Sequence, residues 1–97
     1  MAHQTTCQII KNILASVGVK SASDFTDFSL GAKVNRERNR DIVSRVVFNG
    51  DTLQSAGTIY GINKETVRGI AYKTSRKLAK TKGVDFDAAY RERTSAP

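Results

Sequence analysis

The chain has 97 residues, which suits one compact domain and leaves no room for a catalytic domain beside a separate binding domain. Its formal net charge of +7 favours an acidic partner such as nucleic acid, and its lone cysteine, Cys7, excludes an intramolecular disulfide and a cysteine-rich metal cage. No stretch approaches the roughly 18 apolar residues of a membrane span, and no secretory leader pattern is present. We therefore expect a single domain over residues 1–97 of a cytoplasmic protein with no membrane segment.

Two helices are predicted in the N-terminal part of the chain, between residues 5 and 31. Aliphatic residues recur at helical spacing over 5–17, and Gly18 is a typical helix stop. A second, short helix is expected after Ser23, whose hydroxyl can cap it, and Gly31 would end it. This short helix is expected to bury three apolar side chains, Phe25, Phe28 and Leu30.

A third helix is predicted over residues 36–48, with Asn35 as its N-terminal cap. Its aliphatic residues would face the core and its arginines would face outward. A β-hairpin is the alternative for the end of this segment, because residues 45–48 are rich in valine and the pair at 49–50, Asn-Gly, suits a tight hairpin turn. The residues after that turn do not alternate between apolar and polar, so the helix is preferred.

Two helices joined by a tight turn are predicted next, over residues 53–60 and 64–80. Thr52, or Asp51 before it, would cap the first helix, Gly61 permits the turn, and Asn63 would cap the second helix. The side chains expected to point inward are Leu53, Ala56, Ile59, Ile62, Val67, Ile70 and Ala71. The small residues Ala56 and Gly57 would let the two helices cross closely, as a helix-turn-helix requires.

A last short helix is predicted over residues 85–92, with Phe86, Ala89 and Tyr90 on one face, and residues 94–97 are expected to fray. The predicted fold is therefore all-α and compact. It consists of N-terminal helices within 5–31, a helix-turn-helix core over 36–80 and this C-terminal helix.

Positive charge is concentrated on the longest predicted helix. Residues 64–82 contain seven lysines and arginines but one acid, Glu65. Once the inward positions are assigned to the core, the side chains that remain at the front of this helix are Lys64, Glu65, Thr66 and Arg68. The second helix of a helix-turn-helix enters the major groove with its first residues at base edges, where Lys and Arg suit guanine and Glu suits cytosine. These four residues are the candidate base readers.

A second group of residues is expected to contact DNA phosphates, which supplies affinity rather than sequence preference. Its members are Thr52, Lys73, Arg76, Lys77 and Lys80. Tyr60 and Tyr72 could also reach phosphates, although Tyr72 could equally pack on the core.

Residues 52–78 read TLQSAGTIYGINKETVRGIAYKTSRKL, and this stretch closely resembles conserved region four of the housekeeping class of bacterial sigma factors. In that family the region reads approximately TLEEIG, then FGVTRERVRQI, then a basic tail that ends in RKL, and the spacing matches without a gap. Upstream, residues 36–50 (RERNRDIVSRVVFNG) are similar to the preceding helix of the family. The resemblance covers about half of the chain. It implies a helix-turn-helix and supports the helical interpretation of residues 46–48.

The resemblance also implies roles for particular positions. Lys64, Glu65 and Arg68 would occupy DNA-facing positions, whereas the last of the family's principal base readers, a glutamine, falls on Gly69. A glycine has no side chain with which to bind adenine, so we expect a target other than the promoter element of sigma factors. Residues 1–34 do not match the rest of a sigma factor.

The residues and the resemblance together predict a sequence-specific transcriptional regulator of the phage or plasmid type, which binds double-stranded DNA as a homodimer. The helix over 5–17 or the segment with Phe86 and Tyr90 would supply the dimer surface. Two alternatives remain, an RNA polymerase-binding module and a DNA-binding accessory of a recombinase or terminase. We expect no enzymatic activity, no cofactor and no metal, because His3 and Cys7 supply only two ligands and the paired aspartates suit helix starts.

Overall fold

The computed structural model of the protein describes residues 5–94, and in this range it contains helices but no strands. The helices are α1 (Thr6–Ser16), α2 (Asp27–Leu30), α3 (Lys33–Val43), α4 (Leu53–Tyr60), α5 (Lys64–Thr81) and α6 (Phe86–Thr94), with a 3₁₀ turn, η1 (Ala22–Asp24), and a π-helical turn, η2 (Ser44–Phe48). The all-α prediction is confirmed, and the β-hairpin alternative at 45–50 is excluded. His3 and most of the segment expected to fray, 94–97, lie outside the described residues.

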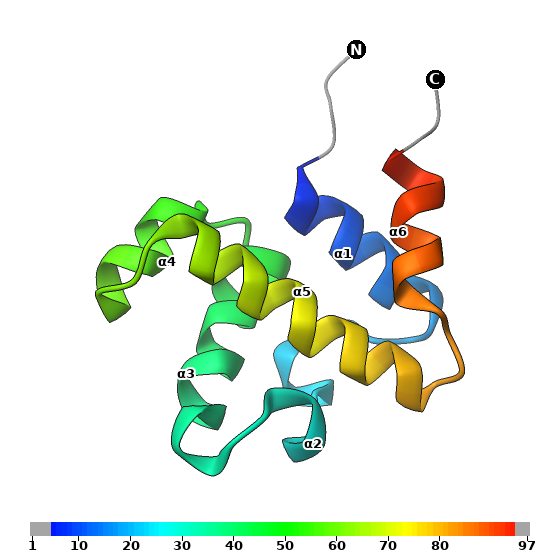
Figure 1. The fold of residues 1–97 in the computed structure, drawn as a ribbon, viewed down its shortest axis with the longest axis horizontal. Coiled ribbons are helices and arrows are strands. Elements are labelled where there is room, and N and C mark those ends of the chain that lie inside the picture. Colours follow the sequence, from blue (N-terminus) through cyan, green and yellow to red (C-terminus); the bar gives the residue numbers. More distant parts are fainter. Residues whose placement is uncertain (1–4, 95–97) are drawn as a thin grey trace.

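Helix α5 is the central element of the fold. It runs across the middle of the molecule and contacts α1, α2, α3, α4 and α6 (Figure 1). Its inner side is buried at helical spacing through Val67, Ala71, Thr74, Ser75, Leu78 and Ala79. Against this side pack aliphatic residues of α1 and α3, including Ile10, Leu14 and Ile42, all fully buried. Because the core lies on one side of α5, the other side of the helix faces solvent or a partner.

The second predicted helix is wrong in its extent and in one buried residue. The chain makes the η1 turn, becomes extended at Phe25, and starts α2 only after Thr26, whose hydroxyl accepts a hydrogen bond from the Ser29 amide. This interruption changes the helical phase between the two phenylalanines. As a result Phe25 and Leu30 are buried, but Phe28 is 65% exposed.

Helix α3 starts earlier than predicted. It begins at Lys33, so Asn35 lies inside the first turn instead of capping it, and no side chain caps this end. The backbone continues through η2 to Phe48, where the Asn49 amide donates to the Ser44 carbonyl. The predicted helical course to residue 48 is therefore confirmed, with a local widening of the helix at its end.

Helix α6 covers the end of the core at which α1 and α5 meet (Figure 1). Its first residue, Phe86, is fully buried, as the sequence pattern predicts. Among residues 5–94, none of the helices has both the length and the apolar character needed to cross a bilayer.

Candidate nucleic-acid interface

The corner between α4 and α5 is built from three local signals. The Thr52 hydroxyl accepts a hydrogen bond from the Ser55 amide at 3.0 Å and so caps α4. Gly61 then adopts a left-handed conformation, with φ +66°, that glycine reaches without steric cost. The Asn63 side chain accepts a hydrogen bond from the Thr66 amide at 2.8 Å and caps α5. All three features agree with the sequence prediction.

The two helices approach each other closely at Gly57. A β-carbon at this position would collide with the carbonyl oxygen of Ile62, so a larger residue would push α4 away from the turn. Next to it, Ala56 and Val67 are fully buried. The predicted close crossing is confirmed.

The inward residues of α4 differ from the prediction at one position. Ile59 is 52% exposed, whereas Tyr60, one residue later, is half-buried against the core. Tyr60 lies four residues after Ala56 and three after Gly57, so it shares a side with both buried residues, whereas Ile59 shares one with Ala56 alone.

Tyr60 also fixes α4 to α3 through a carboxylate. Its hydroxyl donates a hydrogen bond to Asp41, which also accepts one from Arg45 at 2.8 Å. The hydrogen bond from Tyr60, followed by that from Arg45, lowers the pKa of Asp41 below its ordinary value, and the bond to Asp41 raises the pKa of Tyr60. The Tyr60 hydroxyl is thus engaged within the protein rather than free to bind phosphate.

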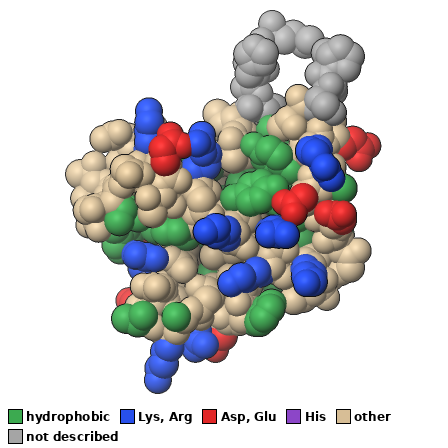
Figure 2. All heavy atoms as spheres, viewed as in Figure 1, with side chains coloured by type: hydrophobic (Ala, Val, Ile, Leu, Met, Phe, Trp, Pro, Cys, Tyr) green, Lys and Arg blue, Asp and Glu red, His purple; other side chains and the backbone are tan. Residues whose placement is uncertain are grey.

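The outward side of α5 carries the predicted DNA-binding residues. Exposed along it are all four candidate base readers and four of the five candidate phosphate-binding residues, namely Lys64, Glu65, Thr66, Arg68, Lys73, Arg76, Lys77 and Lys80. The fifth, Thr52, is exposed at the start of α4. Lys and Arg side chains gather over α5 at the centre of the face seen in Figure 2. The helix therefore separates a buried apolar side from a cationic outer side.

Two of the arginines on this side have partners within the protein. Arg68 forms an ion pair with Glu65, one turn before it on the same helix. Arg76 lies 3.0 Å from the Asp87 carboxylate of α6. Within residues 5–94, Lys64 forms no ion pair, and neither do three lysines in the second half of α5, which are Lys73, Lys77 and Lys80. We call these three the rear lysines of α5.

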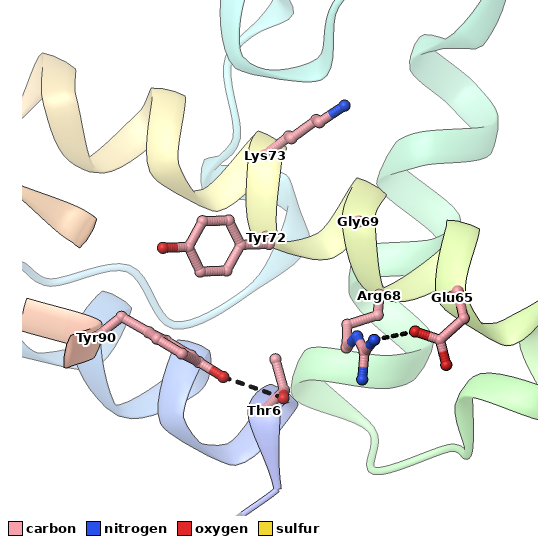
Figure 3. A pocket seen from close by; sticks show the side chains of 7 residues that line it. All are labelled: Thr6, Glu65, Arg68, Gly69, Tyr72, Lys73 and Tyr90. Carbon is pink, nitrogen blue, oxygen red and sulfur yellow. Dashed lines mark hydrogen bonds and ion pairs between the residues drawn. The ribbon is translucent and has the colours of Figure 1, made fainter. Parts of the chain in front are cut away.

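Beside the front of α5 lies an open hollow of about 410 Å³, which we call the α5 hollow. It is lined by Thr6, Glu65, Arg68, Gly69, Tyr72, Lys73 and Tyr90, which come from α1, α5 and α6 (Figure 3). The Tyr90 hydroxyl donates a hydrogen bond to the Thr6 hydroxyl at 3.1 Å and so closes the side of the hollow between α6 and α1.

Tyr72 packs on the core rather than projecting toward a partner. Its ring meets those of Phe86 and Tyr90 edge to face, with centroids 5.0 and 5.2 Å apart, and its hydroxyl donates to Asp87 at 2.5 Å. Burial, followed by the hydrogen bond to Asp87, raises the pKa of Tyr72 to about 12. Because Asp87 is 15 residues away and on another helix, no local sequence signal indicates this pair.

The surfaces expected to form a dimer are largely used inside the protein. Phe86 is buried, Tyr90 is half-buried, and the apolar side of α1 lies in the core. No group of three or more residues suited to hold a metal ion occurs among the described residues.

No protein-family model, curated protein or solved structure matches this chain.

Proposed function

We propose that this chain is a sequence-specific DNA-binding protein that regulates transcription in the cytoplasm, and that α4 and α5 act as a helix-turn-helix. One observation carries the proposal. Helix α5 has a buried, mainly aliphatic side and, opposite it, an outer side from Lys64 to Lys80 on which lysine and arginine predominate among the exposed residues. A surface of this kind suits a partner with a regular row of negative charges, and duplex DNA has one.

The dimensions of α5 suit the major groove. Helices with their side chains are about 10–12 Å across and the groove is about 12 Å wide. The 18 residues of α5 span about 27 Å, long enough for its front to reach base edges while its rear lies near a phosphate strand. In this arrangement Lys64, Glu65, Thr66 and Arg68 face bases, and the rear cations contact phosphates.

The ion pairs refine these roles. Arg68 must exchange part of its contact with Glu65 for a contact with a base, although its guanidinium has five N–H donors and can serve both. Lys64 needs no such exchange and is the more available front cation. Arg76 shares its charge with Asp87, so we expect Lys73, Lys77 and Lys80 to supply most of the phosphate contact.

Thr52 has a distinct place in the proposal. Its hydroxyl already accepts a hydrogen bond from Ser55, yet it retains a proton that it can donate to a phosphate oxygen. The N-terminus of α4 adds the partial positive charge of the helix dipole at the same point. Contact there would fix the orientation of α4 across the strand.

The proposal is tested by measuring duplex binding by fluorescence anisotropy between 50 and 200 mM salt, concentrations chosen to bracket the range in which phosphate contacts weaken. Phosphate contacts from Lys73, Lys77 and Lys80 predict a slope of log K against log salt of about −3, at about 0.9 per neutralised phosphate, and the uncharged Thr52 hydroxyl adds nothing to this slope. A flat response would contradict the proposal and would favour docking to a protein such as RNA polymerase.

Sequence preference is tested separately, by selecting bound duplexes from a random pool. We expect one enriched sequence, because the front of α5 presents side chains of three different chemistries to the bases. A palindromic winner would indicate a homodimer. A pool that stays random would contradict base reading while leaving phosphate binding in place.

A further inference from the structure

Two glycines inside helices of the α4–α5 pair differ in what surrounds them. Gly57 has an internal reason to be glycine, because a β-carbon there would collide with the Ile62 carbonyl. Gly69 has none: a β-carbon at this position would meet no atom within 4 Å, and its backbone is not in the left-handed region. Glycine in a helix interior is less stable than alanine. The fold would therefore gain stability from alanine at position 69.

Gly69 lies between the front and the rear of α5, in the α5 hollow. Figure 3 shows Arg68 extending from α5 toward α1 and Lys73 extending to the other side, with Gly69 between them. If the front of α5 reaches bases and Lys73 reaches a phosphate, the strand that carries this phosphate has to cross α5 between the two. The crossing point is Gly69.

We propose that one sugar-phosphate strand of bound DNA lies directly against the backbone of Gly69, with a phosphodiester group next to the cation of Lys73. This inference rests on the proposed function and names a contact within it. Because Gly69 has no side chain, the strand can lie closer to the helix than it could if position 69 were alanine. The difference is the width of one methyl group.

The lining of the α5 hollow suits such a contact. Arg68 and Lys73 supply positive charge, and the Thr6 and Tyr90 hydroxyls supply polar groups at the edge toward α1. The Tyr72 ring packs on α6 and also lines the hollow, so it gives the hollow an apolar wall. The Glu65 carboxylate repels a phosphate, but its negative charge is offset by the ion pair with Arg68.

The test compares Gly69→Ala with a matched control, Asn12→Ala. Asn12 is exposed in the middle of α1 and does not line the α5 hollow, and asparagine is also a weaker helix former than alanine. We expect Gly69→Ala to raise Tm by about 5 °C, and Asn12→Ala by somewhat less. Since a stabilised variant has not misfolded, a loss of DNA binding in it reports on the contact itself.

The two variants are expected to differ in binding to a mixed-sequence duplex. Gly69→Ala should lower affinity at least ~10-fold, because a charge-assisted contact is displaced, and should reduce the salt slope by about 1. Asn12→Ala should bind as the unaltered protein does. Equal affinity of Gly69→Ala and the unaltered protein would overturn the strand contact but leave the DNA-binding proposal standing.

Two further outcomes also decide the matter. A weaker Gly69→Ala complex with an unchanged salt slope would overturn the phosphate contact, since the lost interaction would then involve a base. If the unaltered protein binds no duplex in the same salt range, the proposed function and this inference fail together.

Discussion

The front of α5, residues 64–68, and its rear, residues 73–80, are both cationic, but they hold their charge differently. The front follows a capped corner pressed against α4 at Gly57, and its Arg68 is fixed by Glu65. Within residues 5–94, the rear pairs Arg76 with Asp87 of α6 and presents three lysines that form no ion pair, as is also true of Lys64 at the front. A positioned group can discriminate between bases, whereas a mobile cation attracts any phosphate. In the proposed function, the front of α5 supplies specificity and the rear supplies affinity.

The largest expected effect comes from removing the rear charges together. Replacing Lys73, Lys77 and Lys80 by alanine should lower duplex affinity on the order of 100-fold at 0.1 M salt and reduce the salt slope by roughly 3. The control replaces three exposed cations outside α5, Lys20, Lys33 and Arg91, which changes the net charge equally. If both triple variants weaken binding to the same degree, overall charge rather than the rear of α5 governs affinity.

The corner that positions the front is tested by Gly57→Ala. The added methyl group has to displace the Ile62 backbone, so we expect a loss of about 2 kcal/mol in the free energy of unfolding, measured in urea. Ser55→Ala, at an exposed position of the same helix, should change stability by much less. A Gly57→Ala protein as stable as the original would show that α4 and α5 are not tightly held at this point.

Single substitutions at the front and the rear sharpen the comparison further. Lys64→Ala should change which base is preferred at one position of the target, by about 1–3 kcal/mol, while Lys77→Ala should weaken all sequences alike. Parallel selections from random duplexes measure both effects. Uniform weakening by Lys64→Ala would remove the distinction between front and rear.

The smallest expected effect concerns Asp87, which joins Arg76 to α6. Asp87→Asn removes the carboxylate charge, so Arg76 becomes available to phosphate and we expect duplex affinity to rise a few-fold. Arg76→Ala in the same background should abolish this gain. Unchanged affinity in Asp87→Asn would place Arg76 outside the DNA contact.

The same substitution has a readout independent of DNA. The pKa of Tyr72 is raised to about 12 in the folded chain, so its contribution to stability is complete below the ordinary tyrosine pKa near 10 and is lost as pH rises toward 12. Asp87→Asn removes the hydrogen bond to a charged acceptor but leaves the burial. Tyr72 should then ionise at a lower pH, as followed by phenolate absorbance. An unaltered alkaline titration would contradict this cause.

The elements that sequence analysis predicts well have local signals. The corner between α4 and α5 depends on Thr52, Gly61 and Asn63, each of which acts on its immediate neighbours in the chain. The buried side of α5 follows from helical periodicity over many residues, and so does the exposure of its cations. Local signals and long periods do not require knowledge of the tertiary fold.

The errors arise where tertiary packing decides. The interruption at Phe25 and Thr26 exposes Phe28, and the early start of α3 removes Asn35 from the cap position. In α4, which is only eight residues long, a shift of one position separates Ile59 from Tyr60. Short helices contain too few repeats to fix the direction of their buried side.

The contacts between helices have no counterpart in the sequence pattern. Tyr60 with Asp41 and Tyr72 with Asp87 are 19 and 15 residues apart and join different helices. The α5 hollow likewise combines α1, α5 and α6. These features could be found only once the helices were placed around α5.

The central claim, that the front of α5 enters the major groove of DNA, is tested most directly by NMR titration of the labelled protein with a duplex. We predict the largest amide shifts over residues 63–69, smaller shifts along the rear of α5 and little change in α2. Shifts concentrated around the exposed Phe28 and Val34, with α5 unperturbed, would contradict the account.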